Sequence, residues 1–335
     1  MVSKKNLKPS LTPIQPTAIL TGPTASGKTS LALRLAETHG QMEIINADSL
    51  LVYRRMDIGT AKPTAEELAQ IPHHLIDICD PSETFSAGDF VRHTHAAIRN
   101  IESRGKRALI VGGTGFYLKA LLKGLWETQP ADLALRAELE KRSPDELYKE
   151  LQAKDPVSAL RISTHDHYRV IRALEIIHLT GKTPTELQRE HELKSAESSA
   201  SRPFSLWIID RETAVLDARI QLRTEQMLEA GFVDEVKSVL KQYPDSRALD
   251  SVGYRQVKDF LTGNPPTGRK IAPGIEGLRQ EIELATRQLV KRQRTWFKSQ
   301  TEAEWFYLPE AEVRLATRFK EIYGNTNPEH PEPIL

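Results

Sequence analysis

The segment from Gly22 to Thr29 constrains the fold of this chain most, because its sequence, GPTASGKT, fits the phosphate-binding pattern G-x-x-x-x-G-K-[ST]. An apolar run, Ala18–Leu20, precedes it and predicts a buried strand, and a helical pattern follows it. Its glycines allow backbone N–H groups to face phosphate oxygens, and the helix N-terminus adds partial positive charge. Lys28 adds a full charge, and the Thr29 hydroxyl is a ligand for phosphate-bound Mg²⁺. This P-loop predicts a phosphorylated ligand without specifying which one.

The composition excludes several classes of protein. The formal net charge of the 335 residues is +1, so any nucleic-acid site must be a local basic patch rather than an overall field. A single cysteine, Cys79, excludes a disulfide framework and a multi-cysteine zinc site, and we interpret it as a small core residue. No apolar run approaches the roughly 20 residues of a membrane span, and no signal peptide opens the sequence. We therefore expect a cytoplasmic protein without membrane attachment, and a monomer.

Short apolar runs alternate with helical patterns along much of the chain. Strands are predicted at Ala18–Leu20, Glu43–Asn46, Ala108–Val111 and Leu206–Asp210, with an edge strand at Trp305–Leu308. The alternation predicts an α/β fold with a P-loop NTPase-like parallel sheet, helices on both faces and an inserted all-helical domain. Ligands of such sheets bind beyond the carboxyl ends of the strands. The P-loop, the residues after Asn46 and the glycine-rich segment Gly112–Gly115 should therefore meet at one edge.

Between residues 131 and 202 the pattern is purely helical. Ser143–Glu146 and Thr183–Glu186 both have the sequence of a capping box with proline at the first helical position, and Gly181 can close the helix that begins near Tyr168. We interpret 131–202 as a helical insertion in a discontinuous core of 18–130 and 203–324, with disordered tails at 1–17 and 325–335. Residues 194–202 resemble a linker. Further core helices are predicted at Val215–Ala230, Val233–Lys241 and Gly277–Ser299.

Two segments that follow predicted strands carry candidate functional groups. Asp48 follows the second strand, where its carboxylate can ligate Mg²⁺ or act as a general base; alternatively it forms an Asx turn. Gly112–Gly115 follows the third strand, where a P-loop ATPase often has a Mg²⁺-binding aspartate. These glycines allow close approach of a ligand, and Thr114 offers a hydroxyl; alternatively the segment is a tight turn.

Basic residues form two further candidate sites. Arg219 and Arg223 lie on one face of a predicted helix and can clamp a diphosphate, or else form a solvated face with Glu225 and Glu229. The acid-free segment Arg287–Lys298 interleaves basic residues with two aromatic ones, which suits a nucleic-acid backbone and an unstacked base, or a basic helix whose aromatic residues lie in the core. Tyr168–Arg172 is a weaker cluster of the same kind. We interpret both histidines of the pair His73–His74 as structural.

Together these segments resemble a known family, the bacterial tRNA dimethylallyltransferases, also called tRNA isopentenyltransferases or IPP transferases. The resemblance spans about Ala18 to Leu308 and is far more specific than the P-loop alone. The matching segments are GPTASGKT at Gly22–Thr29, NADS at Asn46–Ser49, VYRRMDIGTAKP at Val52–Pro63, HHLID at His73–Asp77, FSAGDF at Phe85–Phe90, VGGTGFYLKALLKGL at Val111–Leu125, VGYRQ at Val252–Gln256 and TRQLVKRQRTWF at Thr286–Phe297.

The resemblance implies a reaction in which the dimethylallyl group of dimethylallyl diphosphate passes to N6 of adenosine 37, beside the anticodon of tRNA. It implies Asp48 as the general base and Thr114 as an adenine contact. Arg223, together with Arg219, would neutralise charge on the leaving diphosphate. Mg²⁺ on Thr29 is the implied cofactor. The implied diphosphate-binding residues of the P-loop are Gly22, Pro23, Thr24, Ala25, Ser26, Gly27, Lys28 and Thr29.

The resemblance also implies that the helical insertion grips the anticodon stem-loop and that the adenine is extruded from the loop. Two positions differ from some relatives. Leu51 stands where many relatives have Gln and others an aliphatic residue, so a polar base contact is not implied there, and Asp250 stands where some have Arg, which argues against a phosphate contact by this residue. The implied tRNA contacts are Asp48, Ser49, Leu50, Leu51, Thr114, Arg136, Tyr168, Arg169, Val170, Ile171, Arg172, Asp250, Ser251, Val252, Gly253, Tyr254, Arg255, Lys291, Arg292, Gln293, Arg294, Thr295, Trp296, Phe297 and Lys298.

Three other functions compete with this prediction. An adenylate isopentenyltransferase would not need the helical insertion or the basic segment Arg287–Lys298. A P-loop small-molecule kinase would turn over ATP. A non-catalytic RNA-binding module would not need Asp48, Lys28 and Thr114.

Overall fold

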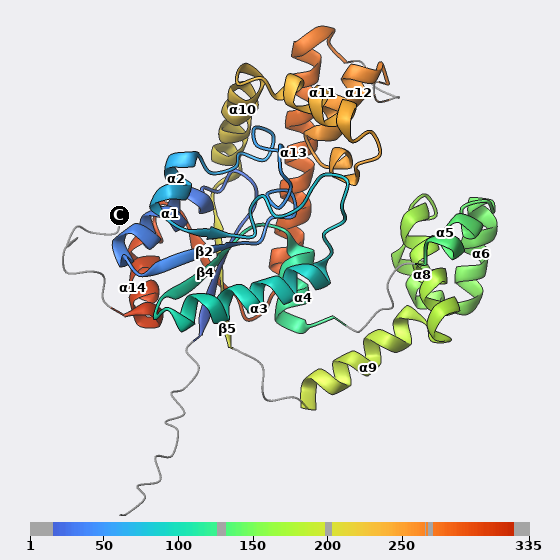
Figure 1. Ribbon diagram of the computed structural model, residues 1–335, viewed down its shortest axis with the longest axis horizontal. Helices are drawn as coiled ribbons and strands as arrows, with labels where there is room; N and C mark the ends of the chain where they lie inside the picture. Colours follow the sequence, from blue (N-terminus) through green and yellow to red (C-terminus); the bar gives the residue numbers. More distant parts are fainter. Residues whose placement is uncertain (1–15, 126–131, 198–202, 265, 267–270, 325–335) are drawn as a thin grey trace, which may run out of the picture. The chain divides into compact units, whose positions relative to one another are not determined.

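The computed structural model describes residues 16–125, 132–197, 203–264, 266 and 271–324 (Figure 1). It divides the chain into two compact units: a core unit, Met1–Ala120 with Arg202–Leu335, and a helical unit, Leu121–Ser201. In this division the helical unit begins at Leu121, and within it His191 Nε2 lies 2.8 Å from the carbonyl oxygen of Lys123. The predicted tail at 325–335 and most of that at 1–17 lie outside the described residues, although Thr17 already belongs to a strand.

The core unit contains a six-stranded sheet in the order β3-β2-β4-β1-β5-β6. Every described strand pair is parallel; in the register, Leu20 of β1 lies opposite Val111 of β4 on one side and Trp207 of β5 on the other. This confirms the predicted fold class, including the edge strand near the C-terminal end. The strands are β1 (Thr17–Thr21), β2 (Met42–Asn46), β3 (His73–His74), β4 (Arg107–Val111), β5 (Phe204–Asp210) and β6 (Glu304–Tyr307).

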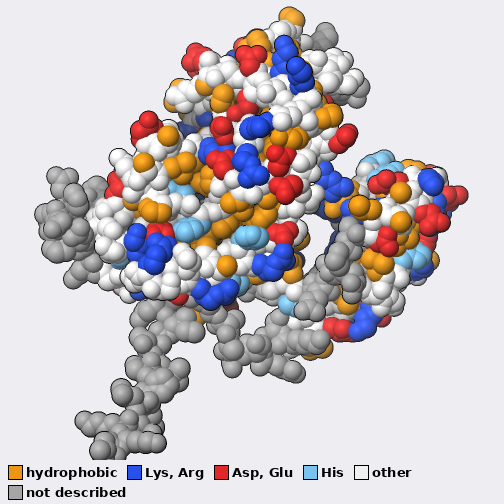
Figure 2. Space-filling view, in the orientation of Figure 1, with side chains coloured by type: hydrophobic (Ala, Val, Ile, Leu, Met, Phe, Trp, Pro, Cys, Tyr) orange, Lys and Arg blue, Asp and Glu red, His pale blue; other side chains and the backbone are white. Residues whose placement is uncertain are grey.

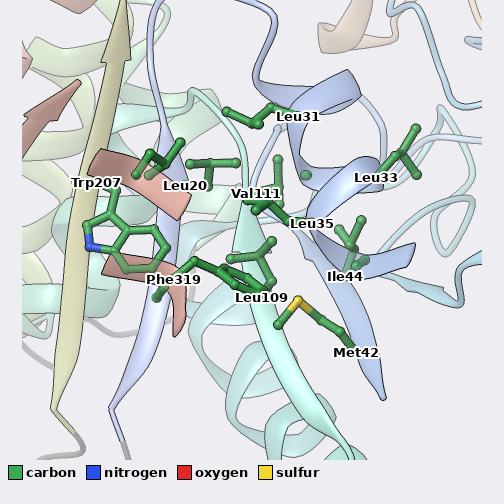
Figure 3. Close-up of a cluster of buried hydrophobic side chains, with 14 of the residues drawn as sticks. Leu20, Leu31, Leu33, Leu35, Met42, Ile44, Leu109, Val111, Trp207 and Phe319 are labelled. Carbon is green, nitrogen blue, oxygen red and sulfur yellow. The ribbon is translucent and has the colours of Figure 1, made fainter. Parts of the chain in front are cut away.

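One face of the sheet is covered by helices α1 (Lys28–His39) and α14 (Glu312–Tyr323). Alternate strand residues such as Leu20 and Leu109 pack there against Leu35 of α1 and Phe319 of α14 (Figure 3). The intervening strand residues, such as Ile110, point to the other face, because successive side chains of a strand alternate. Helix α3 (Ala87–Ser103) contacts β2 and β4 outside that cluster, so helices cover both faces, as predicted.

The remaining core helices surround the carboxyl edge of the sheet and the connections to it. Helix α10 packs on α13, α12 also contacts α13, and α11 contacts both α10 and α12. The bounds of α10, α11 and α13 are close to those predicted, whereas α12 was not predicted. These elements are α2 (Ala65–Gln70), α10 (Thr213–Glu229), α11 (Phe232–Gln242), η1 (Arg247–Asp250), α12 (Tyr254–Thr262) and α13 (Gly274–Lys298), whereas α4 (Gly115–Lys123) begins in the core unit and its residues from Leu121 on belong to the helical unit.

The helical unit has its own small core, in which Leu151 and Leu174 are fully buried. Both predicted capping boxes form: Ser143 pairs with Glu146, and Thr183 with Glu186. Gly181 ends its helix in a left-handed conformation, also as expected. The predicted linker was wrong for residues 194–197, which continue a helix, and 198–202 lie outside the described residues. The helices are α5 (Leu133–Leu139), α6 (Pro144–Lys154), α7 (Pro156–Arg161), α8 (His167–Thr180) and α9 (Pro184–Glu197).

Candidate active site

The P-loop joins β1 to α1 at the carboxyl edge of the sheet. Gly27, the N-cap of α1, has φ 92°, a left-handed conformation that favours glycine. Gly22 lies against the end of β5, where a Cβ would be only 2.2 Å from the carbonyl oxygen of Ile209. Among the described side chains none caps α1, so the N–H groups of its first turn are available to an anionic ligand.

A cavity of about 450 Å³ opens beside the P-loop. Its polar wall comes from the P-loop, the residues after β2 and one face of α10, whereas Leu51, Ile76 and Leu222 contribute apolar surface. Gly22, Pro23 and Ser26 are buried. The predicted residues that line the cavity are Thr24, Ala25, Gly27, Lys28, Thr29, Asp48, Leu51, Arg219 and Arg223; lining residues that we did not predict include Thr60, Ala61, Pro63, Glu67, His73, Ile76, Leu222 and Gln226.

Asp48 is held at the cavity by the strand that precedes it. The side chain of Asn46 accepts a hydrogen bond from the Asp48 amide at 2.8 Å and donates to the carbonyl oxygens of Asp48 and Leu75, both at 2.9 Å. One carboxylate oxygen of Asp48, Oδ1, accepts from the amide of Leu50 at 2.9 Å. The Asx turn and the functional interpretation are therefore compatible, because the turn orients a carboxylate that lines the cavity.

Thr114 links the loop after β4 to the loop after β2. Its hydroxyl oxygen accepts a hydrogen bond from the amide of Ser49 at 3.0 Å and lies 3.3 Å from the Ser49 hydroxyl. The two loops touch at Gly112, where a Cβ would lie 2.2 Å from the backbone of Ala47. Glycine is thus needed at this position for loop packing, and the packing places the Thr114 and Asp48 segments side by side.

The cavity brings three cations, Lys28, Arg219 and Arg223, together with two carboxylates, Asp48 and Glu67. Burial lowers the pKa of Lys28 to about 8, against the attraction of Asp48, which raises it, and Arg223 lowers it further. Burial also lowers the pKa of the Arg223 guanidinium, again opposed by Asp48. Taking two cations out of water is costly unless an anion compensates them. The cations outnumber the two carboxylates of the lining, so the site favours an anionic ligand.

Two arginines donate hydrogen bonds to the backbone of the P-loop. Arg219 Nε donates to the carbonyl of Ala25 at 2.7 Å, and Arg211 Nε donates to that of Ser26 at 2.8 Å. Both guanidinium groups lie near Gly27. Sequence reasoning missed Arg211, although it directly follows β5 and so belongs to the ligand-binding edge of a parallel sheet.

The basic segment of α13 divides into two sets of residues. Gln293 bridges two loops: its Oε1 accepts from the amide of Thr24 at 2.8 Å, and its Nε2 donates to the carbonyl of Gly113 at 3.1 Å. Arg294 makes a multidentate ion pair with Asp210, and Phe297 is fully buried. The predicted tRNA contacts that stay exposed on this segment are Lys291, Arg292, Thr295 and Lys298.

Trp296 packs against the glycine-rich loop: a Cβ built at Gly115 would lie only 2.8 Å from its indole ring. Among the predicted contacts around α12, Tyr254 is fully buried and Ser251 donates to the carbonyl of Ala248. Asp250 forms an ion pair with Lys258, and Arg255 is exposed. On the face shown in Figure 2, acidic and basic side chains are interspersed, in keeping with the near-zero net charge.

In the helical unit, some of the predicted tRNA-contact residues are buried and others are exposed. Val170 and Ile171 belong to the core, so their side chains do not face solvent. Arg136 and Arg172 both pair with Glu175, which is itself fully buried. Tyr168 is half-exposed beneath the guanidinium of Arg136, whose carbon lies 5.4 Å from the ring centre. Arg169 is exposed and pairs with Asp166.

The oxygen donors at the cavity would suit a magnesium ion whose other ligands come from phosphate and water. The Thr29 residue and the Asp48 carboxylate both line the cavity. Mg²⁺ in phosphate sites usually takes only one or two protein oxygens, with water and phosphate completing an octahedron. Within the described ranges no group of three or more His, Cys, Asp or Glu residues could hold a metal by itself.

Histidine and cysteine contribute little chemistry here. His74 pairs with Glu43 at 2.7 Å, which supports the structural role predicted for it. His73 Nδ1 lies 2.6 Å from the carbonyl of Ile71, but the residue also lines the cavity. Cys79 is only partly buried, and burial raises the pKa of its thiol, so the thiolate form is disfavoured. In the part of the chain that the structure describes, no helix is long and apolar enough to cross a membrane.

Comparison with known proteins decides the family. The family model described as IPP transferase matches residues 51–300. This chain belongs to the IPP transferase family. It is 43% identical over 293 residues to tRNA dimethylallyltransferase 1 of Citrifermentans bemidjiense, which covers 87% of this chain and 92% of that relative. It is 40% identical over 314 residues to tRNA dimethylallyltransferase of Geobacter sulfurreducens, covering 91% and 96%.

Solved structures agree with this family assignment. The full-length tRNA isopentenylpyrophosphate transferase of Bacillus halodurans is similar with a TM-score of 0.62 and 35% identity, over 92% of this chain and 94% of that one. A eukaryotic dimethylallyltransferase acting on tRNA is similar with a TM-score of 0.74 and 25% identity, over 95% of this chain and 82% of that one. The P-loop core is therefore common to this chain and these enzymes.

Proposed function

We propose that this protein transfers the dimethylallyl group of dimethylallyl diphosphate to N6 of adenosine 37 in tRNA, giving N6-isopentenyladenosine and diphosphate. The names of its relatives support the reaction class. The observation that carries the proposal is the cavity itself. It combines a P-loop, the partly buried cations Lys28 and Arg223 and the carboxylates of Asp48 and Glu67 with apolar surface at Leu51, Ile76 and Leu222.

The polar and apolar parts of the cavity suit the two parts of the donor. The diphosphate would lie on the P-loop, where Lys28 and the first N–H groups of α1 face it, with Arg219 and Arg223 beside it. The five-carbon group would contact the apolar surface. A nucleotide donor would instead need room and partners for a sugar and a base.

The reaction is then a displacement at the allylic carbon. The N6 nitrogen attacks C1 of the dimethylallyl group, the bond from C1 to the bridging oxygen breaks, and its electron pair leaves on the diphosphate. Lys28 and Arg223 stabilise that developing charge without having to reorganise. Asp48 accepts the N6 proton, while its turn with Leu50 fixes the carboxylate. Thr114, tied to Ser49, would contact the adenine.

Mg²⁺ would be held by Thr29 and the diphosphate, and when bound it would supply further positive charge to the leaving group. A tRNA substrate also favours a location in the cytoplasm. The exposed basic residues Lys291, Arg292 and Lys298 of α13 are the strongest candidates for phosphate contacts in the core unit.

The proposal is tested with purified protein, labelled dimethylallyl diphosphate and unmodified tRNA bearing adenosine 37. We expect label on this tRNA, none on a matched tRNA with guanosine 37, and none on free AMP. Label on AMP would instead identify an adenylate isopentenyltransferase. Hydrolysis of ATP without transfer of label would contradict the proposal and favour a kinase.

A further inference from the structure

A loop that the proposed reaction does not yet use forms one wall of the cavity. This pocket loop, Met56–Pro63, contributes Thr60, Ala61 and Pro63 to the lining. It also reaches the leaving-group site, because the carbonyl oxygen of Thr60 accepts a hydrogen bond from Nη2 of Arg223 at 3.3 Å. The position of the loop therefore bears both on the shape of the cavity and on the orientation of Arg223.

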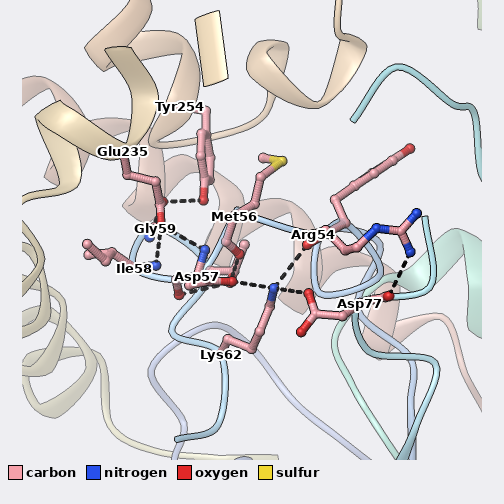
Figure 4. A network of polar contacts seen from close by, with 11 residues as sticks. Arg54, Met56, Asp57, Ile58, Gly59, Lys62, Asp77, Glu235 and Tyr254 are labelled. Atoms are coloured by element: carbon pink, nitrogen blue, oxygen red, sulfur yellow. Dashed lines mark hydrogen bonds and ion pairs between the residues drawn. The ribbon is translucent and has the colours of Figure 1, made fainter. Parts of the chain in front are cut away.

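Glu235, in the first turn of α11, holds this loop with both carboxylate oxygens (Figure 4). Oε2 accepts from the amides of Asp57 at 2.8 Å and Ile58 at 2.7 Å, and Oε1 accepts from that of Gly59 at 3.1 Å. Three consecutive N–H groups thus converge on one side chain. Hydrogen bonds to a charged acceptor are among the stronger ones in proteins, so the carboxylate fixes the backbone of the loop.

Glu235 is itself fixed from the other side by Tyr254, whose buried hydroxyl donates to Oε1 at 2.7 Å (Figure 4). Burial raises the pKa of the Tyr254 phenol, which keeps the hydroxyl protonated and a donor. The rings of Tyr254 and Phe232 meet at right angles with centroids 5.1 Å apart. Gly59 packs against both, since a Cβ there would lie 2.2 Å from Phe232 and 2.7 Å from Tyr254.

The loop is anchored at a second point by Lys62. Its ammonium group donates to the carbonyl of Tyr53 at 3.0 Å and to the carboxylates of Asp57 and Asp77, both at 2.5 Å (Figure 4). Thr60 adds a hydrogen bond to the carbonyl of Met56 at 2.7 Å. With both ends of the loop held, the Thr60 carbonyl has little freedom. The hydrogen bonds of Glu235 to the three loop amides and to Tyr254, here called the Glu235 clamp, therefore determine where this carbonyl lies relative to Arg223.

We propose that Glu235 is a positioning residue for the transfer reaction: through the pocket loop it sets the orientation of Arg223 and the wall against which the donor packs. This inference rests on the proposed function, because it assigns Arg223 to the leaving diphosphate. Glu235 itself lies outside the cavity lining and touches no reacting atom. Its effect on catalysis is transmitted through the three backbone amides and the Thr60 carbonyl.

The test compares Glu235→Gln with Asp234→Asn, which removes an exposed carboxylate from the same helical turn. Gln presents an NH₂ group to amides that need an acceptor, so the loop loses part of its clamp. We expect Glu235→Gln to lower kcat by about tenfold to a hundredfold and to raise KM for dimethylallyl diphosphate, with KM for tRNA unchanged. Asp234→Asn should stay within about twofold of the unmodified protein.

A double-mutant cycle with Arg223→Ala isolates the route of the effect. If Glu235 acts by orienting Arg223, Glu235→Gln should cost much less kcat once Arg223 is absent. Multiplicative effects of the two substitutions, or an effect of Glu235→Gln no larger than that of Asp234→Asn, would overturn the inference. Should Glu235→Gln fail to fold, Tyr254→Phe removes a single hydroxyl from the same clamp and should change kcat in the same direction by less.

Calorimetric binding of inorganic diphosphate without tRNA separates this inference from the proposed function. We expect about tenfold weaker binding to Glu235→Gln than to the unmodified protein. If the unmodified protein transfers no label to tRNA, the proposed function fails, yet the diphosphate comparison still tests the clamp. If transfer occurs and diphosphate binding is equal in the two proteins, the positioning role is wrong while the function stands.

Discussion

Strand β2 has a carboxylate near its amino end, Glu43, and another just beyond its carboxyl end, Asp48, and the two have opposite surroundings. Glu43 is buried and meets three basic side chains: a bidentate pair with Arg104 at 2.6 and 2.8 Å, Lys106 at 2.9 Å and His74 at 2.7 Å. The hydrogen bonds from Arg104, more than any other contact, lower the pKa of Glu43 to about 2.

Asp48 lies instead in a cavity where three cations, Lys28, Arg219 and Arg223, outnumber the two carboxylates of Asp48 and Glu67. Burial lowers the pKa values of Lys28 and Arg223 despite the attraction of Asp48. The comparison shows how one strand serves two purposes. At the amino end the charges are satisfied by the protein and contribute to stability, whereas at the carboxyl end the excess of positive charge is a cost that an anionic ligand removes.

Asp48→Asn should produce the largest effect. Asparagine keeps the turn with the amide of Leu50 but cannot accept a proton, so turnover should fall by about 10²–10⁴-fold with tRNA affinity almost unchanged. Single-turnover transfer assays and tRNA-binding titrations measure the two quantities. Glu43→Gln is the matched control, because it neutralises the other carboxylate of this strand. Near-normal turnover in Asp48→Asn would refute the general-base role.

Lys28→Met should weaken diphosphate binding by about tenfold to a hundredfold. Because burial lowers the pKa of Lys28 to about 8, its charge is lost as the pH rises above 8, so the difference in diphosphate affinity between the two proteins should shrink there. Calorimetry across pH 7–9.5 tests both points. Equal affinity of the two proteins would exclude Lys28 from the diphosphate site.

The same substitution should stabilise the free protein. The folded-state pKa of Lys28 lies below its ordinary value, so at neutral pH its charge opposes folding, and this cost is relieved only as the pH rises from 8 to 10.5. We expect Lys28→Met to raise the free energy of unfolding at pH 7 by about 1–3 kcal/mol, measured in urea. A clear destabilisation would show that the cavity does not hold Lys28 under electrostatic strain.

Glu43→Gln should do the opposite, lowering the free energy of unfolding by about 2–3 kcal/mol at pH 7 while turnover per folded molecule stays unchanged. Because the folded-state pKa is lowered, this contribution is fully present above about pH 4.5 and is lost as the pH falls toward 2. When thermal unfolding is measured from pH 7 to pH 3, the difference in stability between the unmodified protein and Glu43→Gln should therefore decrease. Parallel curves would mean that Glu43 does not titrate in this range.

Neutralising Lys291 and Arg292 should have the smallest effect, a weaker tRNA affinity with a salt slope reduced by about 1–2. Lys237 and Lys241, exposed on α11, provide a control pair of equal charge. Filter binding at several salt concentrations measures the slopes. A slope equal to that of the unmodified protein would place the tRNA path elsewhere.

Local sequence signals predicted most of the fold. The strands are short apolar runs, and Ser143 and Thr183 begin helices through capping boxes that four residues suffice to specify. The rule for parallel strands also predicted that the P-loop, Asp48 and Thr114 would converge. The two-residue strand His73–His74 was not predicted, because its pairing depends on β2 rather than on any pattern of its own.

The rest of the site depends on contacts between residues far apart in the chain. Gln293 binds Thr24, Arg211 binds Ser26, and Glu235 binds Ile58, and nothing local in the sequence marks these pairs. Conversely, contiguous tRNA-contact stretches included side chains such as Ile171 and Tyr254 that helical periodicity turns inward. A sequence motif identifies which positions correspond to a family's contact stretches, but only the fold determines which of those side chains face solvent.

The place of the helical unit in the chain has a consequence for synthesis. Strand β1, which carries the P-loop, pairs with β4 on one side and with β5 on the other, and the helical unit lies between β4 and β5 in the sequence. At about 5–20 residues per second, the ribosome needs roughly 5–20 s to pass from β4 to β5. Throughout that interval one edge of β1 has no partner strand, and an open edge can pair with other chains. The length of the inserted helical unit thus determines the time between synthesis of β4 and synthesis of β5. During that time the open edge of β1 in the nascent chain must be kept from pairing with other chains.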